Sequence, residues 1–189
     1  MNKATHNLSD TLKWISRGPS LDIIKYNAYQ VNSVHFCTRD RDNIRTTQNS
    51  GVSIVATTIQ FSSSKDKNPI EGDMVYYGVI EEIWELYFVT FLFPMFMCQW
   101  VESNHGVRED ELGFTLVDLN WIGHKNDPFI LATQAKQVFY VNDPLDARWS
   151  IVLATKPKEY QNLGVKDENE ILVAHKIFSK GVSVEALIE

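Results

Sequence analysis

Nine short runs rich in β-branched and aromatic residues, separated by turn-forming residues, constrain the fold of this chain most strongly. The turn signals recur about every 8 to 12 residues, as they do in β sandwiches and barrels. Such spacing favours a barrel or sandwich over alternating strands and helices. The predicted strands cover residues 23–31, 34–37, 52–61, 74–83, 86–93, 95–101, 114–119, 137–141 and 149–154.

The two ends of the chain show helical signals. Ser9 and Asp10 predict the N-cap of a short helix that ends at Gly18. Near the other end, apolar residues at helical spacing over residues 167–179 predict a helix. We therefore expect an N-terminal tail (1–13), one β domain (14–160) and a helical C-terminal appendage (161–189).

The most apolar segment spans residues 86–101 and invites a membrane interpretation. A spanning helix needs about 20 apolar residues, whereas this run is shorter, follows Glu85 directly, contains Pro94 and is rich in aromatic residues. We predict instead two consecutive strands with a bend at Pro94, and no membrane partner.

Charge is divided unevenly along the 189 residues, whose net charge is −6. Residues 1–70 carry 9 basic and 5 acidic side chains, whereas residues 71–189 carry 9 and 19, so the two parts have net charges of +4 and −10. An acidic body disfavours general nucleic-acid binding, which depends on many cationic contacts. Only the first part could supply a basic patch.

Neither a metal nor a cofactor is indicated by the residue pattern. Cys37 and Cys98 form no Cys-x-x-Cys pair, and the histidines lack zinc spacing. We expect both thiols to be small buried apolar groups. Because no apolar leader opens the chain, we expect a reduced, intracellular and soluble protein.

Catalytic motifs are also missing from the pattern. Acidic residues are abundant, but their spacing does not predict a convergent two-metal site. Ser50 lacks the Gly-x-Ser-x-Gly context, and no phosphate-binding glycine loop is found. We interpret Asn49-Ser50-Gly51 as a turn in which Gly51 supplies a positive φ. The expectation is a protein that is not an enzyme and has no small-molecule substrate.

Several blocks in the chain carry a family resemblance: Thr46 to Val52, Lys65 to Pro69, Tyr76 to Ile80, Cys98 to Trp100, Gly113 to Leu119, and Asp127 to Tyr140. Over roughly residues 14–159 the chain resembles the plant domain of unknown function 4216, often encoded beside transposases of CACTA (En/Spm-type) elements. The resemblance implies a transposon-derived origin and a nuclear location. It implies no activity, catalytic residues or cofactor.

This chain departs from the family pattern at two places. Family members typically have Val-Asn-Gly where this chain has Val31-Asn32-Ser33, which puts a glycine-dependent turn in doubt. Charged residues of the family are replaced by neutral ones at Tyr87, Leu92, Met97 and Gln99. If those four positions face solvent, they would create a β surface prone to pairing or aggregation.

The function that these observations favour is a non-catalytic adaptor on a small barrel, with an SH3-like or bromo-adjacent-homology-like pattern. Its expected partner is a protein, either a transposase or a chromatin component. Interface hot spots favour Trp, Tyr and Arg. The candidate partner-binding residues are Tyr76, Tyr77, Trp100 and Trp121, with Arg39, Arg41 and Arg45 at the rim. The alternation Arg39-Asp40-Arg41-Asp42 also fits a loop whose charges neutralise one another.

Two alternatives remain open. In a DNA-binding accessory domain, Lys25 and the three arginines would touch phosphates while Gln48 and Asn49 reach base edges. In a decayed element copy, the product would have no selected function, and it would show poor solubility and non-cooperative melting.

Overall fold

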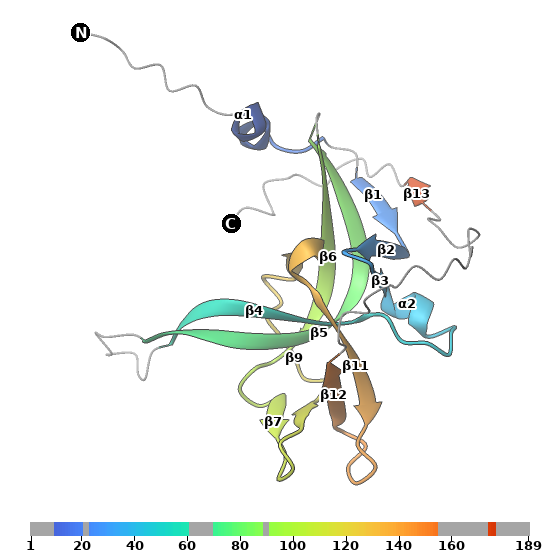
Figure 1. Ribbon diagram of the computed structural model, residues 1–189, viewed down its shortest axis with the longest axis vertical. Helices are drawn as coiled ribbons and strands as arrows, with labels where there is room; N and C mark the ends of the chain where they lie inside the picture. Colours follow the sequence, from blue (N-terminus) through green and yellow to red (C-terminus); the bar gives the residue numbers. More distant parts are fainter. Residues whose placement is uncertain (1–9, 21–22, 61–69, 89–90, 155–173, 177–189) are drawn as a thin grey trace.

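The computed structural model describes residues 10–20, 23–60, 70–88, 91–154 and 174–176, which form a mainly β fold, as predicted (Figure 1). Its helical segments are α1 (Asp10–Arg17), α2 (Arg39–Asp42) and the 3-10 turn η1 (Ala132–Gln134). The strands are β1 (Ile23–Tyr26), β2 (Ala28–Val31), β3 (Val34–Cys37), β4 (Gly51–Gln60), β5 (Ile70–Phe88), β6 (Phe91–Val101), β7 (Val107–Glu109), β8 (Thr115–Val117), β9 (Ile122–Gly123), β10 (Phe129–Leu131), β11 (Lys136–Asn142), β12 (Ser150–Ala154) and β13 (Ala174–Lys176).

One large sheet contains all of these strands except the β2–β3 hairpin. Its order is β10-β6-β5-β4-β11-β12-β8-β7, with β1, β9 and β13 attached at the side. The end strands β10 and β7 do not pair with each other in the described residues. The sheet is therefore open there, and the barrel part of the fold prediction is not confirmed.

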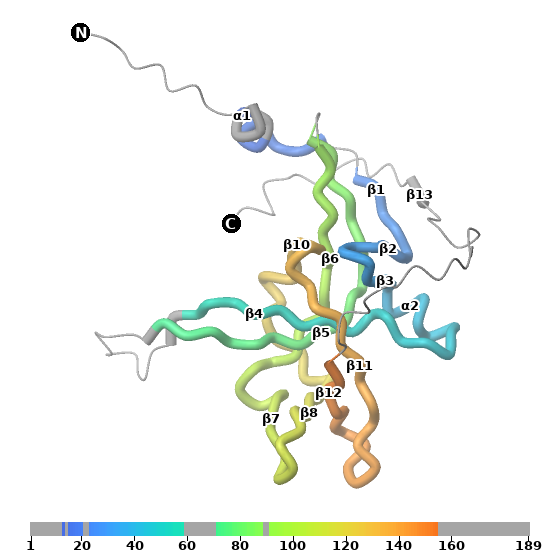
Figure 2. Tube along the Cα trace, viewed as in Figure 1, coloured from blue at the N-terminus to red at the C-terminus, as the bar shows by residue number. Residues whose placement is uncertain are grey.

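The longest strand, β5, takes part in two different structures. Its first half pairs with β4, from Ile70 opposite Gln60 to Val79 opposite Gly51. Its second half pairs with β6, and a register shift between Ile80 and Glu82 marks a bulge, which bends a strand and increases its twist. Figure 2 shows the β4–β5 arm projecting sideways while the β5–β6 hairpin rises toward the top of the view. We call residues 54–60 and 70–77 the arm, and residues 82–88 and 91–97 the covered hairpin.

Two hydrophobic cores form on opposite faces of the central strands. The first core contains Ile80 and Trp100, whereas their chain neighbours Val79 and Val101 belong to the second. This division follows from the period of two along a strand, which sends successive side chains to opposite faces. Both cysteines are buried and free, as expected; Cys98 lies in the first core.

The predicted break at Pro94 is wrong. Pro94 lies inside β6, paired with Glu85, and the two long strands end at Phe88 and begin at Phe91. Proline has no N–H to donate, so a strand tolerates it at a position where no neighbouring strand accepts a hydrogen bond from that residue. The strand β10 pairs with β6 only at residues 95–97, so among the described residues Pro94 has a neighbouring strand on one side only.

Other boundaries also differ from the prediction. The run 23–31 is two strands, because the chain turns at Asn27, whose carbonyl accepts the Thr38 amide at 3.0 Å. At the other end, the helix predicted over 167–179 is wrong at Ala174–Lys176, which pairs with β1 as β13. The rest of that predicted appendage lies outside the described residues, and so does most of the predicted tail. The short N-terminal helix is confirmed as α1, which Gly18 ends with a φ of 78°.

The turn interpretation of Gly51 is also wrong. Gly51 is the first residue of β4 and is not among the residues with positive φ. A Cβ there would lie 2.3 Å from the Val138 carbonyl oxygen and 2.9 Å from the Tyr140 ring. The glycine is required by the close approach of β11.

The tight turn between β2 and β3 forms although Ser33 stands where family members typically have glycine. Asn32 and Ser33 have φ values of 50° and 64° and join Val31 to Val34, which pair directly. These are the two left-handed residues of a tight hairpin turn, at whose second position glycine is favoured. Of the four neutralised positions, Tyr87 and Leu92 are exposed and face each other across β5 and β6, whereas Met97 and Gln99 are half-buried.

Candidate protein-interaction site

A groove lies where the arm meets β6, β10 and the loop that precedes β10. Its cavity volume is about 470 Å³. Ile54, Ala56 and Tyr76 contribute from the arm, because alternate residues of paired strands share one face. We call this cavity the arm groove.

Trp100 lines the inner end of the arm groove and is 4% exposed. Trp100 pairs with Gly78 across β5 and β6. A Cβ on Gly78 would lie 2.6 Å from Cε3 of the indole and 2.8 Å from the Gln99 carbonyl oxygen. The indole can therefore lie against the β5 backbone only because residue 78 has no side chain.

The loop 123–128 forms one side of the arm groove. The His124 ring stands edge-on to the Tyr76 ring, with centroids 5.0 Å apart and planes at 88°. His124 also contacts Ser103, whose Oγ lies 3.1 Å from Nε2. The Asp127 amide donates to the His124 carbonyl at 3.1 Å, so the loop closes on itself beside the arm.

The strand β10 forms the far wall with Phe129 and Leu131. Phe129 pairs with Met97, and its ring lies 4.8 Å from that of Trp84. As the end strand, β10 has no partner on its outer side in the described residues. Beyond Ser53, β4 likewise has a partner only in β5 within the same part of the chain. Two strand edges next to the groove thus lack a strand partner among the described residues, and unpaired edges are the places where a further strand can add to a sheet.

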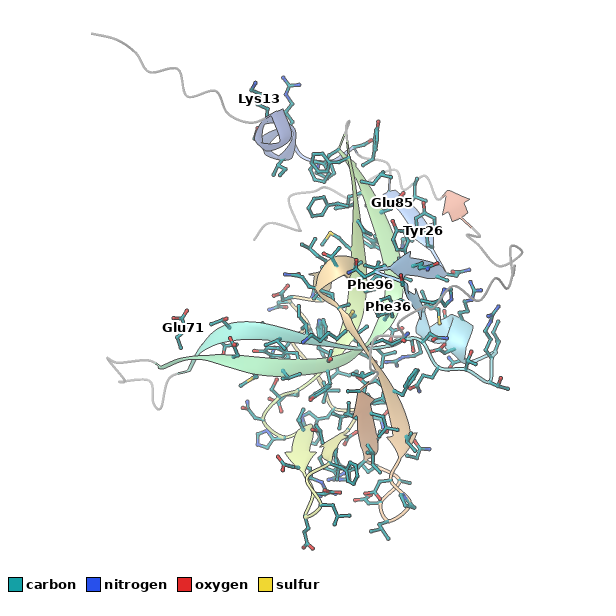
Figure 3. All side chains as sticks on the ribbon, viewed as in Figure 1. Lys13, Tyr26, Phe36, Glu71, Glu85 and Phe96 are labelled. Atoms are coloured by element: carbon teal, nitrogen blue, oxygen red, sulfur yellow. The ribbon has the colours of Figure 1, made fainter. Side chains whose placement is uncertain are left out.

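The part of the arm groove that the structure describes contains a single acidic side chain. Among the described residues that line it there is one carboxylate, Asp127, and no lysine or arginine. The Asp127 side chain is exposed and has no partner in the described part of the chain. The arm carries two more exposed carboxylates, Glu71 (Figure 3) and Asp73, the latter accepting the Thr57 hydroxyl at 2.8 Å.

The structure brings together two of the four predicted aromatic residues. Tyr76 and Trp100 both line the arm groove. Tyr77 points to the opposite face and packs against the second core. Trp121 is 51% exposed, packs near His105 with centroids 6.2 Å apart, and lies outside the groove.

The three predicted arginines do not border the arm groove. Arg39 Nε lies 3.0 Å from Glu81 Oε1, on the bulge of β5. Arg41 and Arg45 line a separate cavity of about 470 Å³ around the exposed Ile44. The alternating basic and acidic residues from Arg39 to Asp42 form the one-turn helix α2 rather than a charged loop.

Gln48 and Asn49, the residues predicted to reach bases in the DNA alternative, make contacts within the fold. Gln48 Oε1 accepts the Tyr140 amide at 2.6 Å, and Asn49 Oδ1 accepts from Gln137 Nε2 at 3.4 Å. The backbone N–H of Asn49 donates to the Asp42 carboxylate. Both side chains therefore hold neighbouring segments of this chain together.

The Asp42 carboxylate also accepts from Cys37 Sγ at 2.8 Å. Burial, reinforced by this carboxylate, raises the pKa of Cys37 to about 12. A thiol with so high a pKa keeps its proton at neutral pH, which agrees with the expected role of Cys37 as a small buried group.

Among the residues of the arm groove that sequence reasoning missed are His124, Asp127 and Phe129. The sequence predicts a loop around His124 and an extended run from Asp127 onward, but not a strand beside Tyr76. The signal for all three is a polar turn that opens onto Phe129-Ile130-Leu131, although the sequence does not reveal which strand this run joins.

Comparisons with known proteins bear on the second half of the domain. Residues 84–152 match the family model described as Domain of unknown function (DUF4216). The match confirms the resemblance over these residues, whereas the predicted resemblance began near residue 14. The matched part includes Trp100, His124, Asp127 and Phe129, and Tyr76 precedes it. No curated protein and no solved structure matches the chain.

The described residues offer no further chemical assignment. Within them, no three His, Cys, Asp or Glu side chains gather where they could hold a metal ion. None of their helices is long and apolar enough to cross a membrane. That the protein is not an enzyme stays a prediction.

Proposed function

We propose that this chain is a non-catalytic protein-interaction module whose arm groove binds an extended segment of a partner protein. The observation that carries the proposal is the convergence of Tyr76 and Trp100 in one cavity beside β10, whose outer edge is unpaired in the described residues. An extended peptide can add to such an edge through main-chain hydrogen bonds, while pockets beside the edge select its side chains.

The identity of the partner rests on the resemblance alone. The transposon-associated character of the family favours a transposase or a chromatin component, and a nuclear location. An adaptor role agrees with a groove that is lined mainly by apolar and aromatic side chains, because interface hot spots are rich in aromatic residues.

The DNA-binding alternative has less support from the contacts. Arg39 pairs with Glu81 and Lys25 with Glu82, so two of its phosphate-binding cations already have acidic partners. Gln48 is half-buried, and its side-chain oxygen already accepts the backbone amide of Tyr140 in β11. The acidic body would also oppose a phosphate backbone.

A pull-down from plant nuclear extract tests the proposal, with nuclease treatment, washes at rising salt, and identification of retained proteins by mass spectrometry. Tyr76→Ser is the test variant, and Val75→Ser is its matched control. These neighbours lie on opposite faces of the same strand, and Val75 is 41% exposed. We expect a salt-resistant partner that Tyr76→Ser retains about ten-fold less well, as for a hot-spot residue, and that Val75→Ser retains normally.

The retained protein is then purified and its binding to the chain measured directly. Recovery that disappears with nuclease or modest salt, and is abolished by replacing Arg39, Arg41 and Arg45 with Ala, would instead favour DNA binding. Poor solubility with a non-cooperative melt of the unmodified chain would favour a decayed copy.

A further inference from the structure

We propose that the arm groove recognises an arginine side chain of the bound segment, an inference that rests on the proposed function. The first argument is charge. Asp127 is the one carboxylate among the described lining residues, no lysine or arginine accompanies it there, and its side chain has no partner in that part of the chain. A cation from the partner would complement this charge.

The second argument is the chemistry of the groove walls. Rings of Tyr76, Trp100 and Phe129 line the cavity together with the His124 imidazole. A guanidinium group is planar and weakly hydrated, stacks on aromatic faces, and can bond both oxygens of a carboxylate. A lysine ammonium is more strongly hydrated and lacks the planar fork. The combination of rings and carboxylate therefore favours arginine.

The third argument is an arrangement of the same groups elsewhere in this protein. Around Trp149, the guanidinium carbons of Arg108 and Arg148 lie 4.1 Å and 4.9 Å from the ring centroid. Arg148 Nε also lies 3.7 Å from Asp118 Oδ2. That site unites an indole, a guanidinium and a carboxylate, whereas the arm groove provides the rings and the carboxylate only.

The test is a selection of short random peptides displayed on phage against the full chain, followed by affinity measurements on one selected peptide. The peptide is compared with versions in which its arginine is replaced by citrulline, a neutral isostere, or by lysine. Protein variants are Asp127→Asn and, as a matched charge control, Asp40→Asn. Asp40 is exposed and lies at the separate cavity near Ile44.

We expect the selected peptides to share an arginine and to lose affinity with Tyr76→Ser. Citrulline should weaken binding to the unmodified chain about ten-fold, lysine should weaken it by a smaller factor, and Asp127→Asn should remove most of the citrulline effect. Asp40→Asn should bind like the unmodified chain.

Two results would overturn the inference in distinguishable ways. Peptides that need Tyr76 but share no arginine, or that bind equally well with citrulline or lysine, would refute arginine recognition and leave the proposed function standing. Selected peptides whose binding is unaffected by Tyr76→Ser, or a selection that enriches none, would refute both.

Discussion

The two halves of β5 have very different surroundings, although they belong to one continuous strand. In the covered hairpin, β1 pairs along one edge of β5, and the β2–β3 hairpin packs on one face through Phe36 and Phe96 (Figure 3). In the arm, Val55 and Val75 face each other across the ribbon and are still 44% and 41% exposed. One half of the strand builds the core, whereas the other presents a surface.

Acidic side chains show the same contrast. Glu85 in the covered hairpin is 6% exposed, and its oxygens accept the hydroxyls of Tyr26 and Tyr29, each at 2.9 Å. Glu71 and Asp73 in the arm are exposed to water. A buried carboxylate requires partners from the protein, whereas an exposed one is solvated and remains available to a ligand. The buried carboxylate thus belongs to the half of β5 that builds the core, and the exposed carboxylates belong to the half that presents a surface.

The largest expected effect is that of Phe96→Ala in the covered hairpin. Phe96 is fully buried, and its ring lies 5.0 Å from that of Phe36. Removing a buried phenyl ring should lower the free energy of unfolding by about 3–5 kcal/mol. Val75→Ala in the arm should lower it by less than about 1 kcal/mol, because Val75 is already partly in water. Denaturant unfolding of both variants measures the difference, and equal losses would contradict the division of β5.

Gly78→Ala tests the position where the two halves meet. The added methyl group would clash with the Trp100 indole and the Gln99 carbonyl. We expect a loss of about 1–3 kcal/mol in the free energy of unfolding, as for other overpacked sites. Trp100 should also move, which tryptophan fluorescence can report. Gly72→Ala in the arm is the matched control, because nothing lies within 4 Å of its added Cβ; a comparable loss there would show that any alanine in β5 is harmful.

Tyr29→Phe removes one of the two hydroxyls that Glu85 accepts. Because the buried Glu85 carboxylate then has one hydroxyl partner fewer, we expect the free energy of unfolding to fall by about 1–2 kcal/mol at neutral pH. Thr57→Val provides the comparison in the arm. It removes the hydroxyl that donates to the exposed Asp73, where water can replace it, so we expect almost no change. Denaturant unfolding measures both losses of stability, and equal losses would contradict the view that burial of the carboxylate determines the cost.

The same tyrosine predicts a pH dependence. Burial, followed by the Glu85 hydrogen bond, raises the pKa of Tyr29 from 10.0 to about 12. Between these values the unfolded chain loses the phenol proton while the folded chain keeps it, so stability falls as pH rises through this window. Tyr29→Phe lacks that contribution. The stability gap between the two proteins should therefore narrow from about pH 10 to about pH 12 in denaturant titrations, and a constant gap would contradict the pKa assignment.

Local patterns in the sequence are sufficient to predict several elements. Residues 34–37, 137–141 and 149–154 are strands within one residue at either end, because alternation and turn residues mark them locally. The continuation of β5 to Phe88 is not predictable in this way. Pro94 signals a break in the sequence pattern. It fits inside β6 because, among the described residues, only β5 pairs with the strand at that position.

The arm groove is harder to predict than the strands. Residue type selects Tyr76 and Trp100. These two side chains meet because Trp100 pairs with Gly78, and Tyr76 lies two residues before Gly78 on the same face of β5. Asp127 and His124 join them because β10 pairs with β6, a long-range contact with no local signal. Residue type alone cannot separate Tyr76 from Tyr77, because their division between two faces depends on which faces the cores cover.

The smallest expected effect concerns the hairpin that covers β5 and β6. Ser33 adopts a φ of 64°, which costs about 1–2 kcal/mol for a residue with a Cβ, whereas glycine adopts it freely. We expect Ser33→Gly to raise the free energy of unfolding by about 1 kcal/mol after the entropy cost of glycine, and Ser33→Ala to change it little. Hydrogen exchange should show slower opening of amides in the covered hairpin and unchanged exchange in the arm. Equal slowing in the covered hairpin and in the arm would mean that the two halves of β5 open together, and it would contradict the proposed difference between them.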